Sequence, residues 1–91
     1  MKANVIVINP QDNVAVALQD IKAGETVILS DGHKFIAMAD IPYSHKIALA
    51  DIAKGEDIIK YGEIIGEAKE PIHKGFWIHT HNMDIEDKKG A

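Results

Sequence analysis

The chain has 91 residues, of which 46% are hydrophobic and 26% are charged, so it can form one small domain with its own core. Its net charge of −4 and its pI near 5.6 argue against nucleic acid or an anionic membrane as a main partner. It has no cysteine, which excludes disulfides and thiolate metal sites and fits a reducing cytoplasmic compartment. No transmembrane helix or signal peptide is predicted, because every apolar run is short.

Strand signals dominate the first part of the chain. Residues 5–8 are a short β-branched run that is closed by the turn pair Asn9-Pro10. Over residues 13–18 large side chains alternate with alanines, which is typical of a strand covered on both faces. An amphipathic helix is the alternative for this segment, and its valines count against that alternative.

A short pattern then recurs along the chain. Residues 20–27 are similar to residues 51–58 and, less closely, to residues 71–78. Each copy has an apolar residue, two mostly polar residues, a glycine and a second apolar run. This order predicts a strand end, a tight turn in which the glycine has a positive φ, and a return strand. The copies are too few for a solenoid, so we expect duplicated β-elements that fold on one another.

Further hairpins are predicted between these copies. Asp31-Gly32 is a turn signal between two short apolar runs, and Gly62 separates two more strands in residues 57–68. Gly66 indicates a bulge or a close approach of another backbone. The sequence therefore predicts one mostly β domain over residues 1–85, with short irregular strands and little helix. Residues 86–91 form a polar tail that we expect to be solvated.

The candidate chemistry lies near the end of this domain. If residues 76–82 form a strand, Trp77, His79 and His81 share one face, with the two histidine Cα atoms roughly 7 Å apart. Two such imidazoles can converge on a metal ion or an anionic substrate, but they can equally be polar residues on an exposed edge. Zinc and iron sites need a third or fourth ligand, which His45 or a partner could supply. His33 and His73 lie in predicted turns and are expected to be exposed.

Several spaced motifs together resemble one known family. They are Asn9-Pro10-x-Asp12-Asn13, Ile41-Pro42-x-x-His45-Lys46-Ile47-Ala48-Leu49, Lys60-Tyr61-Gly62-x-x-Ile65-Gly66 and His79-Thr80-His81-Asn82. In this order they are similar to the N-terminal SAF-type domain of the altronate/galactarate dehydratase family, which has a β-clip fold. The resemblance covers residues 5–82. Ser44 departs from it, because the family usually has glycine before the histidine-lysine pair, and this puts the local turn in doubt.

The resemblance implies a small subunit that works with a large catalytic subunit in the dehydration of a sugar acid. It implies a divalent metal, typically iron, shared with that subunit. A similar two-part enzyme, sulfolactate sulfo-lyase, is an alternative, as is a non-catalytic binding or assembly module, or a stand-alone protein that binds a metal or a sugar acid. Self-association through apolar turns is a further expectation.

Dehydration removes a proton next to a carboxylate and expels a hydroxyl group, so it needs groups that exchange protons and neutralise charge. We therefore expect His79, His81 and His45 to be catalytic, with His79 and His81 close to the metal. All ten basic residues are lysines, so no arginine can clamp the substrate carboxylate. We expect Lys46, Lys60 and Asn82 to contact the substrate.

Overall fold

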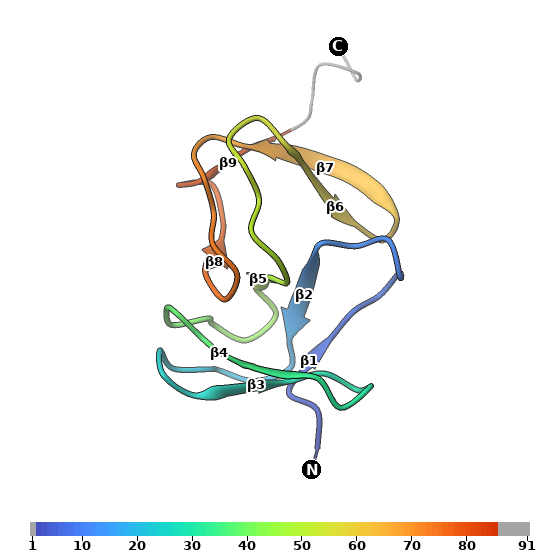
Figure 1. The fold of residues 1–91 in the computed structure, drawn as a ribbon, viewed down its shortest axis with the longest axis vertical. Helices are drawn as coiled ribbons and strands as arrows, with labels where there is room; N and C mark the ends of the chain where they lie inside the picture. Colours follow the sequence, from blue (N-terminus) through green and yellow to red (C-terminus); the bar gives the residue numbers. More distant parts are fainter. Residues whose placement is uncertain (1, 86–91) are drawn as a thin grey trace.

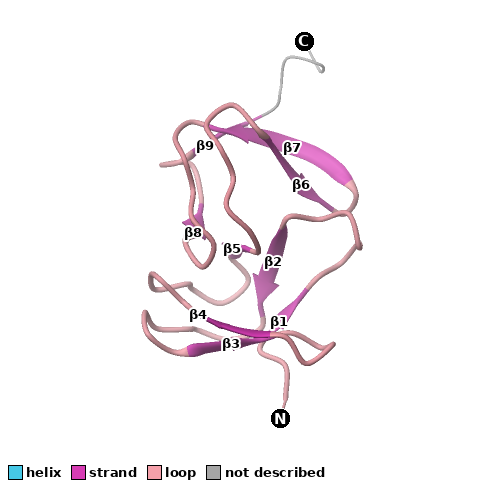
Figure 2. Ribbon diagram, viewed as in Figure 1, coloured by secondary structure: helices cyan, strands magenta, loops and turns pink. Residues whose placement is uncertain are grey.

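The computed structural model describes residues 2–85, and it contains strands and loops without any helix in that range (Figures 1 and 2). The strands are β1 (Val5–Ile6), β2 (Val14–Ala17), β3 (Thr26–Ile28), β4 (Lys34–Ile36), β5 (Lys46–Ala48), β6 (Asp57–Lys60), β7 (Glu63–Ala68), β8 (Trp77–Ile78) and β9 (Met83–Ile85). The mostly β prediction is confirmed. The predicted tail, residues 86–91, lies outside the described residues. No helix in the described part is long and apolar enough to cross a membrane.

The strands form three small antiparallel sheets. The central sheet has the order β1-β2-β5-β8, the β3–β4 hairpin forms a second sheet, and β6-β7-β9 form a third. Figure 1 shows the β3–β4 hairpin at one end of the molecule and the β6–β7 hairpin with β9 at the other, with the central sheet between them. The predicted strand at residues 13–18 is present as β2, and the helical alternative for it is wrong.

The two faces of the central sheet carry two different hydrophobic cores. Ala15 of β2 and Ile47 of β5 are paired and belong to the first core, which also holds Val27 of β3. Val14 and Ala48 are paired on the opposite face and belong to the second core. Successive residues of a strand point to opposite faces, so β2 and β5 supply apolar side chains to both cores. This explains why large and small apolar residues alternate along β2.

The repeated pattern forms two bridges of similar geometry. Ile21 and Ile41 exchange backbone hydrogen bonds of 2.9 and 2.7 Å, and Ile52 and Ile72 exchange bonds of 2.7 and 2.8 Å. Ile52 and Ile72 each follow their counterparts by 31 positions in the sequence. Each of these four isoleucines is nearly inaccessible to solvent: Ile21, Ile52 and Ile72 come from the three predicted copies, and Ile41 lies between the first two. The prediction of duplicated β-elements is confirmed.

The side chains that support these units are also duplicated. The Asn4 amide donates to and accepts from the backbone of β3, and the Asn13 amide does the same for β6. Each amide therefore acts as an additional strand residue at the edge of a hairpin. The two hairpins are consequently attached to the central sheet in the same way.

Candidate functional site

The predicted strand over residues 76–82 is wrong, because β8 ends at Ile78 and residues 79–82 form a turn. The turn is closed by Asn82, which is only 4% exposed. Its Oδ1 accepts a hydrogen bond from the His79 N–H (3.0 Å) and its Nδ2 donates to the Trp77 carbonyl (2.8 Å). A side-chain amide that satisfies buried backbone groups competes with strand pairing, which is why the alternating pattern does not continue.

The turn nevertheless brings the predicted histidines together around the indole of Trp77. Lys46 of β5 pairs with Ile78 of β8, so the next position places His45 across from His79, and their ring centroids lie 5.2 Å apart. The His79 ring stacks on the indole at 5.3 Å with an interplanar angle of 6°. The His81 ring lies 5.2 Å from the indole at a tilt of 45°. We call Trp77, His45, His79 and His81 the Trp77 cluster.

A hydrogen bond fixes the state of one imidazole in this cluster. The Trp77 Nε1–H donates to Nδ1 of His45 at 3.1 Å. Indole nitrogen is a donor only, so Nδ1 of His45 must carry its lone pair and the neutral ring has its proton on Nε2. Nε2 of His45 is therefore assigned as the nitrogen that can donate to another group.

The cluster opens to solvent at one side. His45, His79 and Trp77 are half-buried, whereas His81 is exposed. His81 also borders a cavity of about 270 Å³, which is lined by Glu70, Pro71, Ile72, His73, Phe76, His81 and Asn82. Its lining combines apolar side chains with two imidazoles, those of His73 and His81.

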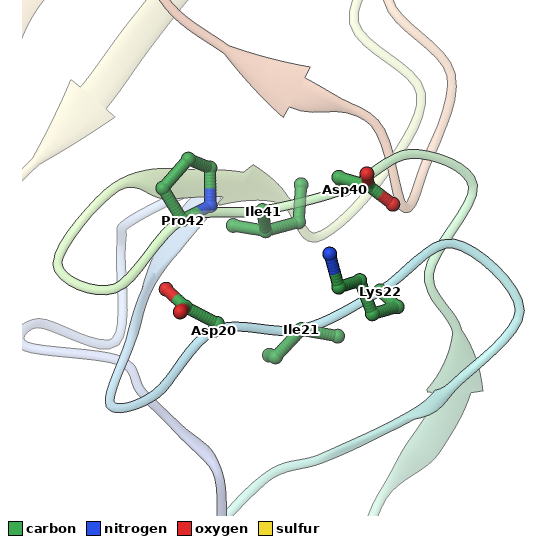
Figure 3. Close-up of a pocket in the computed structure, with 6 residues that line it drawn as sticks. All are labelled: Asp20, Ile21, Lys22, Asp40, Ile41 and Pro42. Atoms are coloured by element: carbon green, nitrogen blue, oxygen red, sulfur yellow. The ribbon is translucent and has the colours of Figure 1, made fainter.

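A cavity of similar size, about 280 Å³, lies away from the cluster (Figure 3). It spans the first bridge and is lined by Asp20, Ile21, Lys22, Asp40, Ile41 and Pro42. The Asp20 carboxylate accepts a hydrogen bond from the Tyr43 N–H (2.8 Å), and Asp40 accepts one from the Ala23 N–H (2.9 Å). These carboxylates hold the two turns in place, so this cavity follows from the architecture of the bridge.

One of the two predicted lysines, Lys46, lies on the sheet face opposite Trp77. Val16, Lys46 and Ile78 are cross-strand partners and share one face of the central sheet, whereas Trp77 lies on the other face. Burial lowers the pKa of the Lys46 ammonium from its usual 10.5, and the positive charge of Lys60 lowers it further. The charge of Lys60 is therefore part of the electrostatic surroundings of Lys46.

The histidines outside the cluster are exposed, as predicted. His33 bonds to Asp31 in the β3–β4 turn, and Nδ1 of His73 lies 3.8 Å from a carboxylate oxygen of Asp51. Both imidazoles are largely accessible to solvent. Either residue can therefore serve as an exposed control in experiments on the histidines of the Trp77 cluster.

The described residues do not supply a complete metal site. Within residues 2–85 no group of three or more His, Asp or Glu side chains is placed to hold a metal ion. Nδ1 of His45 accepts the indole hydrogen bond and the Asn82 amide bonds to backbone, so neither of these atoms is free to bind an ion. His79 and His81 remain predicted neighbours of a metal whose other ligands must come from elsewhere.

Sequence reasoning missed two residues that organise this region. Trp77 was expected only to share a face with the histidines, yet its indole contacts all three rings. Asp12 was noted only as part of a motif, yet it is 8% exposed and its carboxylate accepts hydrogen bonds from the N–H groups of Asn9, Tyr61 and Gly62. The available signal for Asp12 is an acidic residue two positions before the apolar strand β2.

Comparison with known proteins identifies the family. The family model described as the altronate/galactarate dehydratase SAF domain matches residues 3–86. The chain is 46% identical over 77 residues to an altronate dehydratase of Escherichia coli, covering 85% of this chain and 15% of that enzyme. It is 43% identical over 75 residues to the galactarate dehydratase (L-threo-forming) of Escherichia coli, covering 80% of this chain and 14% of that enzyme.

A shorter relative is matched over most of its length. The chain is 43% identical over 58 residues to the (2R)-sulfolactate sulfo-lyase subunit alpha of Paracoccus pantotrophus, covering 62% of this chain and 87% of that subunit. In contrast, the chain spans only about one seventh of the length of the dehydratases. Because the family model matches almost the whole sequence, the chain belongs to the altronate/galactarate dehydratase SAF domain family.

Proposed function

We propose that this chain is the small subunit of a two-part cytoplasmic hydro-lyase that dehydrates a sugar acid of the altronate or galactarate type. The observation that carries the proposal is the Trp77 cluster, in which three imidazoles gather at one end of β5 and β8. Membership of a family whose relatives include altronate and galactarate dehydratases supports the reaction class. The large catalytic subunit would supply most of the substrate pocket.

The chemistry of dehydration suits such a cluster. The reaction takes a proton from the carbon next to the carboxylate and returns a proton to the departing hydroxyl group, and imidazole exchanges protons near neutral pH. We assign proton transfer to His79 and His81, since neither ring is held by a hydrogen bond within residues 2–85 and His81 borders the cavity. His45 presents an N–H at Nε2 and would donate a hydrogen bond to the substrate.

The metal that the resemblance predicts, a divalent ion and most simply iron, is assigned to the large subunit. When bound, it would stabilise negative charge on the substrate as a Lewis acid. The described residues of this chain lack a three-ligand group, so His79 and His81 would complete or border a site held mainly by the partner. Asn82 would act by orienting the turn that carries both histidines.

The direct test is a reconstituted dehydration assay with the large subunit, using His79→Ala and His81→Ala separately. Each substitution should lower turnover by roughly 10²- to 10⁴-fold, the usual contribution of a positioned acid or base. His33→Ala is the matched control, because His33 is an exposed histidine on the β3–β4 turn and should leave turnover unchanged. Normal assembly with wild-type turnover in both cluster variants would show that the catalytic assignment is wrong.

The same assay separates the non-catalytic alternative. If the large subunit alone has full activity, this chain is a binding or assembly module and not a contributor to the active site. Metal retained by the isolated chain would instead favour a stand-alone metal-binding protein.

A second candidate reaction is supported by the match to 87% of a sulfolactate sulfo-lyase subunit alpha. That relative is named as a subunit, and the matched region covers 62% of this chain. Offering altronate, galactarate and (2R)-sulfolactate to the reconstituted enzyme distinguishes the two, because sulfite is released only in the sulfo-lyase reaction.

A further inference from the structure

Trp77 is the one tryptophan of the chain, and contacts apart from the imidazoles hold it in place. Its backbone pairs with Ile47 of β5, and its carbonyl accepts the hydrogen bond of 2.8 Å from Nδ2 of Asn82. Its side chain is half-buried and packs against the first core. The sheet and the core therefore fix the position of the indole, and the rings around it are placed relative to it.

The hydrogen bond from Trp77 limits what His45 can do. The indole Nε1–H donates to Nδ1 of His45 at 3.1 Å, so this lone pair is occupied and the ring proton lies on Nε2. While the bond is intact, neither nitrogen has a lone pair to offer a substrate. His45 can then only donate from Nε2, and acceptance of a proton is left to the other imidazoles of the Trp77 cluster.

Stacking acts on His79 in a different way. Its ring lies nearly parallel to the indole, at 5.3 Å and 6°, which is the offset-stacked arrangement that aromatic rings favour. The N–H and the lone pair of an imidazole lie in the plane of the ring, so contact through the face leaves both nitrogens available. The His45 ring, 5.2 Å away at a tilt of 49°, limits rotation further. Trp77 therefore orients His79 without engaging its nitrogens.

His33 provides an internal reference with the opposite proton position. Its Nδ1 lies 2.9 Å from Oδ2 of Asp31, and an ionised carboxylate can only accept, so the proton of this ring lies on Nδ1. His33 belongs to the β3–β4 turn and has no ring contact with Trp77 in the described part of the chain. Two neutral tautomers should therefore coexist, and only that of His45 should depend on the indole.

We propose that Trp77 is a positioning residue, which fixes the proton of His45 on Nε2 and the ring plane of His79. This role deepens the proposed function and rests on it for the reaction that the histidines serve. It divides the work within the Trp77 cluster. His45 donates a hydrogen bond, whereas His79 and His81 keep nitrogens that can exchange protons. The indole acts only through the imidazoles, so it needs no contact with the substrate.

The first test measures the proton positions directly. Long-range ¹H–¹⁵N NMR of the 91-residue chain at pH 8 suits it, because imidazoles with the ordinary pKa of about 6.5 are neutral there. His45 should show a protonated Nε2 and an unprotonated Nδ1, and His33 should show the reverse. Trp77→Phe removes the donor but keeps an aromatic ring. The His45 signals should then move toward the average of the two tautomers, while those of His33 stay unchanged.

The second test measures kcat and KM of the enzyme reconstituted with the large subunit. Trp77→Phe should lower kcat about tenfold, the contribution of one hydrogen bond, and should leave KM within about threefold of wild type. Trp77→Leu also loses the stack and should lower kcat roughly a hundredfold, so the phenyl ring should restore part of the rate. Phe35→Leu is the matched control, because Phe35 also packs against the first core but lies in β4, and it should leave kcat unchanged.

Several results would overturn the proposal, once backbone amide spectra have verified that each variant is folded. One is a His45 proton on Nδ1, and another is a His45 spectrum that does not change in Trp77→Phe. Wild-type kcat in both Trp77 variants, with His79→Ala inactive, would also overturn it, as would equal losses in Phe35→Leu and Trp77→Leu. The proton positions are measured without turnover, so they succeed or fail independently of the reaction that the chain serves.

Discussion

The β3–β4 hairpin and the β6–β7 hairpin have the same framework but different surroundings. Val27 pairs with Phe35 in the first hairpin, and Ile58 pairs with Gly66 at the corresponding positions, 31 residues later, in the second. The first remains a two-stranded sheet, whereas the second is joined by β9 (Figure 1). Similar backbone units thus support different numbers of strands.

One side chain accounts for the difference. Phe35 packs against the first core, whereas Gly66 has no side chain, and the Asp84 backbone of β9 lies in the space that one would occupy. A Cβ added to Gly66 would be 2.2 Å from the carbonyl oxygen of Asp84. Because β9 directly follows the turn at residues 79–82, the glycine also determines where that turn, and with it the Trp77 cluster, can lie.

The largest effect that should separate the hairpins is Asp12→Ala. Asp12 fastens only the second hairpin, since its carboxylate accepts three backbone hydrogen bonds, two of them from Tyr61 and Gly62 at the hairpin tip. Hydrogen bonds to a charged group contribute about 1.5–3 kcal/mol each, and the freed N–H groups regain part of this from water. We expect the free energy of unfolding to fall by about 3–4 kcal/mol in urea denaturation.

Asp31→Ala is the comparison at the tip of the first hairpin. The Asp31 carboxylate bonds only within its own turn and is exposed, so its removal should lower stability far less. Equal losses in the two variants would mean that the hairpins are fastened alike and that Asp12 has no special role.

The next largest effect should come from Gly66→Ala, which tests why β9 joins only one hairpin. The added methyl group overlaps the Asp84 carbonyl and the Met83 side chain, so β9 must move, at a cost of about 2–3 kcal/mol. Hydrogen exchange should increase at the amides of β7 and β9. Gly24→Ala has open space around the new methyl group and should cost only about 1 kcal/mol, from its positive φ.

If the amides of β9 remain protected from hydrogen exchange in Gly66→Ala, β7 and β9 can accommodate a methyl group at position 66 without losing their pairing. The histidine turn would then be expected to keep its geometry, and the contacts of Trp77 with His79 and His81 would be unchanged. If β9 is displaced, those ring contacts should be lost together with the pairing.

Local chemistry made much of this fold predictable, and long-range contacts account for what was missed. The turn at Asp31-Gly32, the positive φ of Gly24 and the close backbone approach at Gly66 follow from properties of single residues. The turn at residues 79–82 does not, because the alternation of Trp77, His79 and His81 fits a strand equally well. Its geometry depends on the Asn82 amide and on the pairing of β9 with β7. An alternating sequence pattern gives no information about either of these contacts.

The candidate site shows the same division. The three histidines were predicted from motif and spacing, and they do gather, but around Trp77 and in a turn. The hydrogen bonds from Tyr61 and Gly62 to the Asp12 carboxylate join distant parts of the chain, and no sequence spacing predicts them. Residues from separate sheets meet only once the second core has formed.

A smaller effect should follow from Ser44→Gly, at the turn where a serine has a positive φ. Ser44 has φ 66°, and its counterpart Gly75 has φ 91°, so the serine maintains the turn in a conformation that favours glycine. Its N–H donates to Ala17 (2.8 Å) as the Gly75 N–H donates to Ala48 (2.9 Å). Relief of the strain, less the greater chain entropy of glycine, should raise the free energy of unfolding by about 0.5–1 kcal/mol.

The reciprocal change, Gly75→Ser, should destabilise the protein. A Cβ at Gly75 would lie 2.8 Å from the Ile36 carbonyl oxygen and 2.9 Å from the Met38 side chain. Thermal unfolding of both variants provides the measurement. A lower stability for Ser44→Gly would show that the serine hydroxyl makes a compensating contact and that the two turns are not equivalent.

The smallest effect concerns the first hairpin alone and tests whether its tip is self-contained. The backbone N–H of His33, and secondly its imidazole, hold the pKa of the Asp31 carboxyl below its usual 3.8. A carboxyl pKa that folding lowers stabilises the protein above the unfolded value, and this contribution is lost as the pH falls through the folded pKa. Because the backbone N–H remains in His33→Ala, the pKa of Asp31 should rise only part of the way toward 3.8 in a carboxyl ¹³C titration. If the pKa of Asp31 returned to 3.8, the imidazole alone would be responsible for lowering it, and if the pKa did not change, the backbone N–H alone would be responsible.

The second hairpin differs, because its tip is held by the carboxylate of Asp12, from a distant part of the chain.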